Sequence, residues 1–177
     1  MRLYEEQNKD VEKLYYMEKD RLKGFATVEG TEKYYRRSQN EPEDINQINY
    51  NESLQVHHSN FRSPFNSLLK ISTIGYGSYM GNPDDMTDYK MYDALKQSVL
   101  SGGVNHIDTA PNYRYMKSER TIGKVLTTLE SKYNIPRNQL FIATKVGYVP
   151  EDADNMVLRS EMIQRLVRDQ GVPADSI

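Results

Sequence analysis

The chain of 177 residues contains no cysteine and no tryptophan. Without cysteine it can form neither disulfide bonds nor zinc-thiolate sites, and it has no thiol nucleophile. It also lacks an excess of charge of either sign, since 23 Lys and Arg residues stand against 25 Asp and Glu residues. Because these charges are mixed along the chain, the sequence shows no basic surface of the kind that binds nucleic acids or anionic membranes.

Long apolar runs are missing as well. No stretch of about 18 apolar residues is present, which excludes a membrane-spanning helix at the level of the sequence. The first six residues, Met1 to Glu6, lack the apolar segment of a signal peptide and are too acidic for an ordinary transit peptide. We therefore expect a cytoplasmic protein, or a mitochondrial one if this sequence is a mature form. What the chain has in abundance is tyrosine, with 14 residues, which we interpret as a compositional bias.

The first 66 residues divide into two parts. Residues 1–23 are dense in charge and carry apolar residues at roughly helical spacing from Tyr4 to Leu22, with Gly24 placed to end a helix. Such a charged N-terminal helix either docks on its own domain or binds a partner protein. Residues 24–66 show no sustained periodicity and many turn-forming residues, which predicts an extended or disordered arm.

Residues 67–177 alternate between strand and helix patterns. We expect strands over Leu68–Gly77, Val104–Asp108 and Leu140–Lys145, the last of them apolar on both faces. Helical patterns of 12 to 16 residues separate these strands, as in βαβ units. The sequence therefore predicts an α/β fold with a parallel sheet covered on both sides.

The helix boundaries follow from capping residues. Thr87 is placed to cap the first helix, whose stripe runs from Tyr89 to Leu100, and Ser118 to cap the second, which Pro136 prevents from continuing. A last helix is expected over residues 160–170, before Gly171.

A glycine-rich run, Gly75-Tyr76-Gly77-Ser78-Tyr79-Met80-Gly81, follows the first strand. Such a run favours a Rossmann dinucleotide fold, with Asp108 as the acid that binds the ribose. However, residues 82–86 separate the glycines from the helix, and they place Asp84 and Asp85 where a phosphate should lie. We therefore prefer a different interpretation.

Three side chains that can move a proton follow two of the predicted strands. Asp108 ends the second strand, Lys145 ends the third, and Tyr113 lies five residues after Asp108. The carboxyl ends of parallel strands in a barrel share one rim, so these side chains should meet there. Asp108 would orient Lys145, and the lysine would lower the pKa of Tyr113 so that it can protonate a carbonyl oxygen. The alternative is an ion pair at the rim with no catalytic duty.

Four segments together resemble the aldo-keto reductase family. They are Gly75–Ser78, residues 103–110 (Gly-Val-Asn-His-Ile-Asp-Thr-Ala) with Tyr113, residues 118–123 (Ser-Glu-Arg-Thr-Ile-Gly) and residues 143–147 (Ala-Thr-Lys-Val-Gly). Residues 25–34, 81–84 and 112–114 are similar to a less studied subgroup of this family. The resemblance covers roughly residues 24–177.

The resemblance implies the first three βα units of a (β/α)₈ TIM barrel over residues 67–177, following the N-terminal helix and the arm. It implies NADPH-dependent reduction of an aldehyde or ketone, with Asp108, Tyr113 and Lys145 as catalytic residues and Gly75, Gly77 and Ser78 beside the cofactor. The catalytic histidine and the NADP phosphate site of the family have no counterpart in the sequence, so we expect the isolated chain to be inactive.

The remaining histidines do not replace that group. His57 and His58 lie in the predicted arm, and His106 lies inside the second strand, where a packing role is expected. Without cysteine or a cluster of acids they predict no metal site.

A partial barrel leaves an unpaired strand edge, which proteins normally pair or cover. We therefore expect a protein partner or a larger assembly to complete the sheet. The alternative function is a non-catalytic, aldo-keto reductase-like structural subunit of a protein complex.

Overall fold

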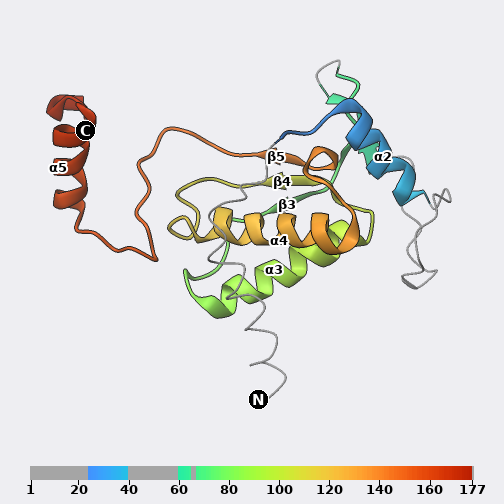
Figure 1. Ribbon diagram of the computed structural model, residues 1–177, viewed down its shortest axis with the longest axis horizontal. Helices are drawn as coiled ribbons and strands as arrows, with labels where there is room; N and C mark the ends of the chain where they lie inside the picture. Colours follow the sequence, from blue (N-terminus) through green and yellow to red (C-terminus); the bar gives the residue numbers. More distant parts are fainter. Residues whose placement is uncertain (1–23, 40–59, 65–66, 177) are drawn as a thin grey trace.

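The computed structural model describes residues 24–39, 60–64 and 67–176 (Figure 1). The predicted helix over residues 1–23 lies outside these ranges, as do His57 and His58. In the part of the chain that is described, no helix is long and apolar enough to cross a membrane.

A three-stranded parallel sheet forms the centre of the fold. Its strands are β3 (Gly75–Gly77), β4 (His106–Asp108) and β5 (Phe141–Ala143), in that order. The register pairs Gly77 with Asp108, and Asp108 with Ala143, so the carboxyl ends of the three strands are level. The predicted α/β fold with a parallel sheet is therefore confirmed.

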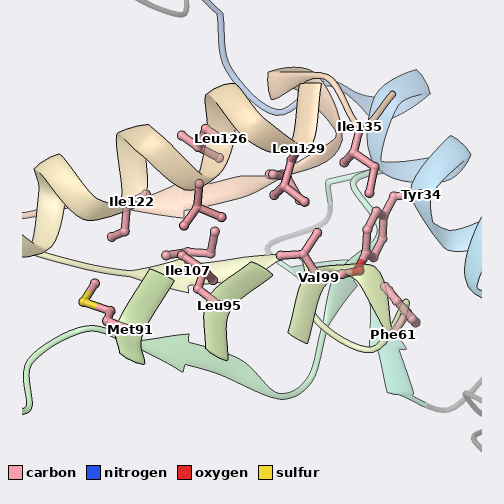
Figure 2. Close-up of a cluster of buried hydrophobic side chains, with 12 residues drawn as sticks. Tyr34, Phe61, Met91, Leu95, Val99, Ile107, Ile122, Leu126, Leu129 and Ile135 are labelled. Atoms are coloured by element: carbon pink, nitrogen blue, oxygen red, sulfur yellow. The ribbon is translucent and has the colours of Figure 1, made fainter. Parts of the chain in front are cut away.

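Two helices, α3 (Asp85–Leu100) and α4 (Lys117–Tyr133), pack side by side on one face of this sheet (Figure 1). Figure 2 shows the apolar side chains of α3, α4 and β4 pointing toward one another. Leu95, Ile107 and Leu129 in this core are fully buried. Burying a side chain of this kind contributes about 1.5–3 kcal/mol, so the contact between the helix pair and the sheet is the main source of stability for this part of the chain.

The other face of the sheet is open in the described residues. Ile107 and Ile142 face the helices, whereas the alternate residues His106, Asp108 and Phe141 are half-buried. Among the described residues helices thus cover one face, and coverage of the other face stays a prediction. The apolar character of the third strand signalled a covered sheet, but only the side that carries Ile142 is packed against helices.

The segment that we expected to be one strand, Leu68–Gly77, is divided in two. Its first part, β2 (Ile71–Ser72), pairs antiparallel with β1 (Phe61–Arg62), and only its second part joins the parallel sheet as β3. The division has a physical cause, because the Ser72 hydroxyl donates to the carbonyl of Ile74 at 2.8 Å and turns the chain between the two strands.

The arm predicted over residues 24–66 contains a helix, α2 (Val28–Ser38), which corrects that expectation. The Thr27 hydroxyl caps it by accepting from the Gly30 N–H at 3.0 Å. The helix lies against the 3₁₀ turn η3 (Arg137–Gln139), and an added Cβ at Gly30 would come within 2.3 Å of the Asn138 carbonyl oxygen. Because α2 is held by this close backbone contact, it lacks the long apolar stripe by which a helix is recognised in a sequence.

Two predicted caps are also corrected. The carboxylate of Asp84, not Thr87, caps α3 by accepting from the Thr87 N–H at 2.8 Å. Helix α4 begins at Lys117 without a side-chain cap, because the Ser118 hydroxyl donates to the carbonyl of Ser78 instead. The ends of both helices agree with the prediction, since α3 stops before Gly102 and α4 before Pro136.

The last helix, α5 (Arg159–Gln170), agrees closely with the predicted range and ends at Gly171 in the left-handed conformation. A long connection separates it from β5, and it lies apart from α3 and α4 in Figure 1. A short 3₁₀ turn, η4 (Ala174–Ser176), follows it.

Candidate active site

The carboxyl ends of the parallel strands bring the three predicted proton-moving side chains together. Asp108 is the last residue of β4 and pairs in register with Ala143, the last residue of β5. Lys145 follows two residues later, and Tyr113 lies in the loop between β4 and α4. The predicted meeting at one rim is therefore present in the structure.

Lys145 and Asp108 form a direct ion pair. The lysine Nζ donates to Asp108 Oδ1 at 2.7 Å and to the carbonyl of Thr109 at 3.0 Å. The hydrogen bond with Asp108, and to a smaller extent that with Tyr113, raises the pKa of Lys145 above its ordinary value. The lysine is thus held as a cation in one orientation, as the sequence led us to expect.

Tyr113 lies beside this cation. The Lys145 Nζ is 4.8 Å from the centre of the Tyr113 ring, a distance at which the ring face attracts an ammonium group. The ring of Tyr79 meets the Tyr113 ring edge-on, with centroids 5.1 Å apart. The three groups therefore form a continuous contact from carboxylate to ammonium to phenol.

The glycine turn closes the opposite side of the rim. Gly77 has open space where a side chain would stand, next to Asp108 in the register. At Gly75 an added Cβ would come within 3.0 Å of His106 Nδ1, so this position is tight. Of these two glycines, Gly77 therefore leaves room for a flat group to approach the backbone at the rim.

Ser78, the third predicted cofactor residue, is buried and engaged with the backbone. Its N–H and its hydroxyl both donate to the carbonyl of Asp108, at 3.1 and 3.0 Å. The hydroxyl thus fixes the loop after β3 to the end of β4. A contact of Ser78 with a cofactor stays a prediction.

The first turn of α4 fastens the surrounding loops. Ser118 donates to the Ser78 carbonyl at 2.7 Å, and Glu119 accepts from the Thr144 hydroxyl at 2.6 Å, one residue before Lys145. Arg120 donates to Asp152 at 2.5 and 2.8 Å, beyond β5. Three consecutive side chains therefore hold the loops that follow β3 and β5.

A family model for the aldo/keto reductase family matches residues 73–170, which is more than half of the chain. The chain belongs to this family. The match contains all six predicted site residues, from Gly75 to Lys145.

Three curated aldo-keto reductase relatives align with the chain. L-galactose dehydrogenase of Arabidopsis thaliana is 31% identical over 110 residues, which cover 59% of this chain and 33% of that protein. Aldo-keto reductase AFTS1 of Alternaria alternata is 36% identical over 98 residues, or 53% and 26% of the two chains. Aldo-keto reductase AMT2 of the same organism is 33% identical over 106 residues, or 58% and 28%. The alignments thus span a third or less of each relative, and no solved structure matches significantly.

His106 has the packing role that we expected. Its ring is half-buried and packs edge-on against Phe141, with centroids 5.5 Å apart. It lies on the open face of the sheet, at the end of β4 opposite Asp108.

Two residues of the rim were missed in the sequence. Asp88 lies in the first turn of α3 on the buried side, where we expected the apolar stripe, and Arg114 directly follows Tyr113. The two side chains form an ion pair at 2.6 Å. A signal was present in the sequence, since Asp88 is one turn before Met91 and so on the same helix face as the core.

Proposed function

We propose that this chain supplies the proton-donating part of an NADPH-dependent reductase that acts on an aldehyde or ketone. The observation that carries the proposal is the contact sequence Asp108–Lys145–Tyr113 at the carboxyl ends of β4 and β5. Family membership supports an oxidoreductase, and the relatives are named as a dehydrogenase and as aldo-keto reductases.

Each side chain has one task in this reaction. The Tyr113 hydroxyl gives its proton to the carbonyl oxygen of the substrate, which becomes a hydroxyl group. Lys145 stabilises the negative charge that remains on the phenol oxygen, because its ammonium group is fixed beside the ring. Asp108 keeps the lysine charged and oriented through the 2.7 Å bond. When bound, the reduced nicotinamide supplies the hydride that the carbonyl carbon receives.

The open space over Gly77 fits the approach of a nicotinamide ring to the rim. Gly77 pairs with Asp108, so a ring resting there would be adjacent to the acid that orients Lys145. Gly75 contributes by letting β3 lie close to His106, and Ser78 by holding the turn in place.

The test compares two Tyr→Phe substitutions in the protein that contains this chain. Turnover of small aldehydes is followed by the loss of NADPH absorbance. Tyr113→Phe should reduce turnover by about 100- to 10,000-fold, the usual share of a general acid. The matched control, Tyr133→Phe, changes a tyrosine at the far end of α4 and should leave turnover unchanged.

Two results would overturn the proposal. One is turnover in Tyr113→Phe equal to that of the unchanged protein. The other is an absence of NADPH binding, measured by quenching of nicotinamide fluorescence, even after addition of a polypeptide that carries the remaining strands of a barrel.

A second candidate, a non-catalytic subunit of a complex, is favoured by the open sheet. Among the described residues β5 is hydrogen-bonded to a neighbour on one edge only, and such an edge tends to pair with another strand. We propose that further strands, from this polypeptide or a partner, cover that edge in either case. Purified chain that is monomeric in light scattering, with no co-purifying protein, would count against the subunit.

A further inference from the structure

The loop that carries Tyr113 has an unusual backbone. Arg114, Tyr115 and Met116 follow one another in the left-handed region, with φ angles of 52°, 54° and 71°. Residues with a Cβ rarely adopt this conformation, and three in succession need compensating interactions nearby. The strained turn begins directly after the tyrosine that we expect to donate the proton.

A buried guanidinium group holds this turn. The side chain of Arg114 is 1% exposed. Its Nε donates to the Asn82 carbonyl at 2.9 Å, and one terminal nitrogen donates to the Asp84 carbonyl at 3.2 Å and to Asp88 Oδ1 at 2.6 Å. The other terminal nitrogen lies 3.3 Å from the sulfur of Met91. Arg114 is thereby bound to the start of α3 and to the loop before it.

The Asp88 carboxylate accepts hydrogen bonds from three side chains, two of which belong to α4. Besides Arg114, the carboxylate accepts from Lys117 Nζ at 3.0 Å and from the Thr121 hydroxyl at 3.2 Å. Lys117 and Thr121 belong to the first turns of α4, immediately after the strained residues. We call Arg114, Asp88, Lys117 and Thr121 the Arg114 anchor. It joins the part of the loop that follows Tyr113 to the start of α3 and to the first turns of α4.

The contacts of the Tyr113 side chain restrict it much less than those of Arg114 restrict the guanidinium group. Its ring contacts are with Tyr79, which is 66% exposed, and with Lys145, whose side chain is 47% exposed. Tyr79 restricts the ring poorly, because its own side chain is largely exposed to water, and Lys145, although held by Asp108, offers a single ammonium group 4.8 Å from the ring centre, which cannot enclose the ring. The place of the phenol is therefore set through the backbone, by the neighbour that is buried.

We propose that Arg114 and Asp88 are positioning residues that hold Tyr113 at the distance from Lys145 that proton donation requires. This inference rests on the proposed function for its catalytic part. Its structural part stands separately, because the mobility of Tyr113 can be measured without any turnover.

The experiment uses fluorine NMR of the protein with meta-fluorotyrosine in place of tyrosine. The Tyr113 and Tyr133 signals are assigned by their loss in the two Tyr→Phe variants. Arg114→Gly removes the anchor while glycine accepts the positive φ without strain, so it separates anchoring from backbone strain. Arg114→Lys keeps the charge but loses the fork that reaches three acceptors. Arg165→Lys, in an exposed ion pair of α5, is the matched control.

In both Arg114 variants the Tyr113 signal should shift and narrow, while the Tyr133 signal remains in place. Turnover should fall by about tenfold to 100-fold with little change in the KM for NADPH, because misplacement of a reacting group mainly affects the chemical step. Asp88→Asn, which leaves the carboxyl shape but not the charge, should shift the same signal. Arg165→Lys should change neither signal nor turnover.

A purely structural role gives a different pattern. The melting temperature of the Arg114 variants would fall while the Tyr113 signal and the turnover of folded protein stay unchanged, and that result would overturn the proposal. If Arg114→Lys unfolds, all tyrosine signals collapse together. The position of the Tyr113 signal in Arg114→Gly, which relieves the strained turn, then tests the proposal. A shifted Tyr113 signal in a protein without carbonyl turnover would retain the positioning and reject the proposed function instead.

Discussion

The two ends of the parallel sheet are built from different chemistry. At the amino end, buried neutral groups join the strands: Asn105 is fully buried and exchanges hydrogen bonds with the Ser72 backbone and hydroxyl at 2.8 and 3.0 Å. At the carboxyl end, the ion pair of Asp108 and Lys145 is about half exposed. One end is closed by neutral hydrogen bonds, whereas the other carries a half-exposed ion pair in addition to the buried pair of Arg114 and Asp88.

This difference indicates a division of labour. Breaking a buried neutral hydrogen bond costs much free energy, and such bonds do not respond to pH, so they suit a part of the fold whose role is structural. Half-exposed ion pairs add little stability but keep side chains accessible and polarised, which suits chemistry. Ligands of parallel α/β folds bind outside the carboxyl ends of the strands, and the arrangement of this chain agrees with that rule.

Lys145→Met should give the largest effect, and it should be confined to activity. Removing the ammonium group leaves Tyr113 without the charge beside its ring, so we expect turnover to fall by about 100- to 10,000-fold. The midpoint of urea unfolding should hardly move, because the pair with Asp108 is half exposed. Lys132→Met, at the solvent-exposed end of α4, is the control. A large loss of stability in Lys145→Met would contradict the division into a structural amino end and a chemically active carboxyl end of the sheet.

Asn105→Ala should give the largest effect on stability. The side-chain amide also donates to the Lys70 carbonyl at 2.8 Å, so its loss leaves buried groups of β2 and its neighbours without partners. We expect the free energy of unfolding to fall by about 3 kcal/mol, measured in urea. Asn155→Ala, at an exposed position, should change it by less than about 0.5 kcal/mol. Turnover per folded molecule that falls as much as in Lys145→Met would contradict the comparison.

Tyr34→Phe tests the stability of the amino end of the sheet by removing a single hydroxyl group. The buried hydroxyl of Tyr34, in α2, lies 2.6 Å from the Val99 carbonyl and 2.8 Å from the Val104 carbonyl, and its one proton serves both. Burial raises its pKa, so it stays a donor throughout the physiological range. We expect a loss of about 2 kcal/mol, compared with almost none in Tyr133→Phe. An unchanged urea midpoint would show that α2 does not stabilise the amino end.

The same contrast explains what could be predicted from the sequence. The carboxyl-end residues Asp108, Tyr113 and Lys145 were found because each lies at or just beyond the end of a strand, and the parallel register of β4 and β5 brings them together. Local pattern and topology were sufficient there. The alternation of strands and helices was equally readable, since the apolar spacing of α3 and α4 reflects the core that they share.

The amino end was not predicted, because its contacts join residues far apart in the chain. Tyr34 bonds to carbonyls 65 and 70 residues away, and Asn105 to residues 33 to 35 positions before it. The resemblance of residues 25–34 to a subgroup of the family marked the segment around Tyr34, but it did not indicate which groups the Tyr34 hydroxyl would reach. The Arg114–Asp88 pair was missed for the same reason, because its members are 26 positions apart in the sequence.

The smallest effect concerns the loop that crosses the carboxyl end. Arg120 lowers the pKa of Asp152 to about 2 from 3.8. Because the folded value is depressed, the stabilisation is fully present above the ordinary carboxyl pKa and is lost as the pH falls through about 2. Next to this carboxylate the Ala153 N–H donates to the Tyr115 carbonyl at 3.1 Å. Acid should therefore detach the loop from the Tyr113 region.

Hydrogen exchange of the Ala153 amide measures this detachment. Its protection should decrease as the pH falls below about 4, before that of the amides of β4, after correction for the intrinsic pH dependence of exchange. Asp152→Asn should remove the same protection already at neutral pH, whereas Asp169→Asn, in an exposed pair of α5, should not. If Ala153 and the strand amides lose protection together, the carboxyl end is not a separately detachable layer. The charged rim would then be as integral to the fold as the neutral end.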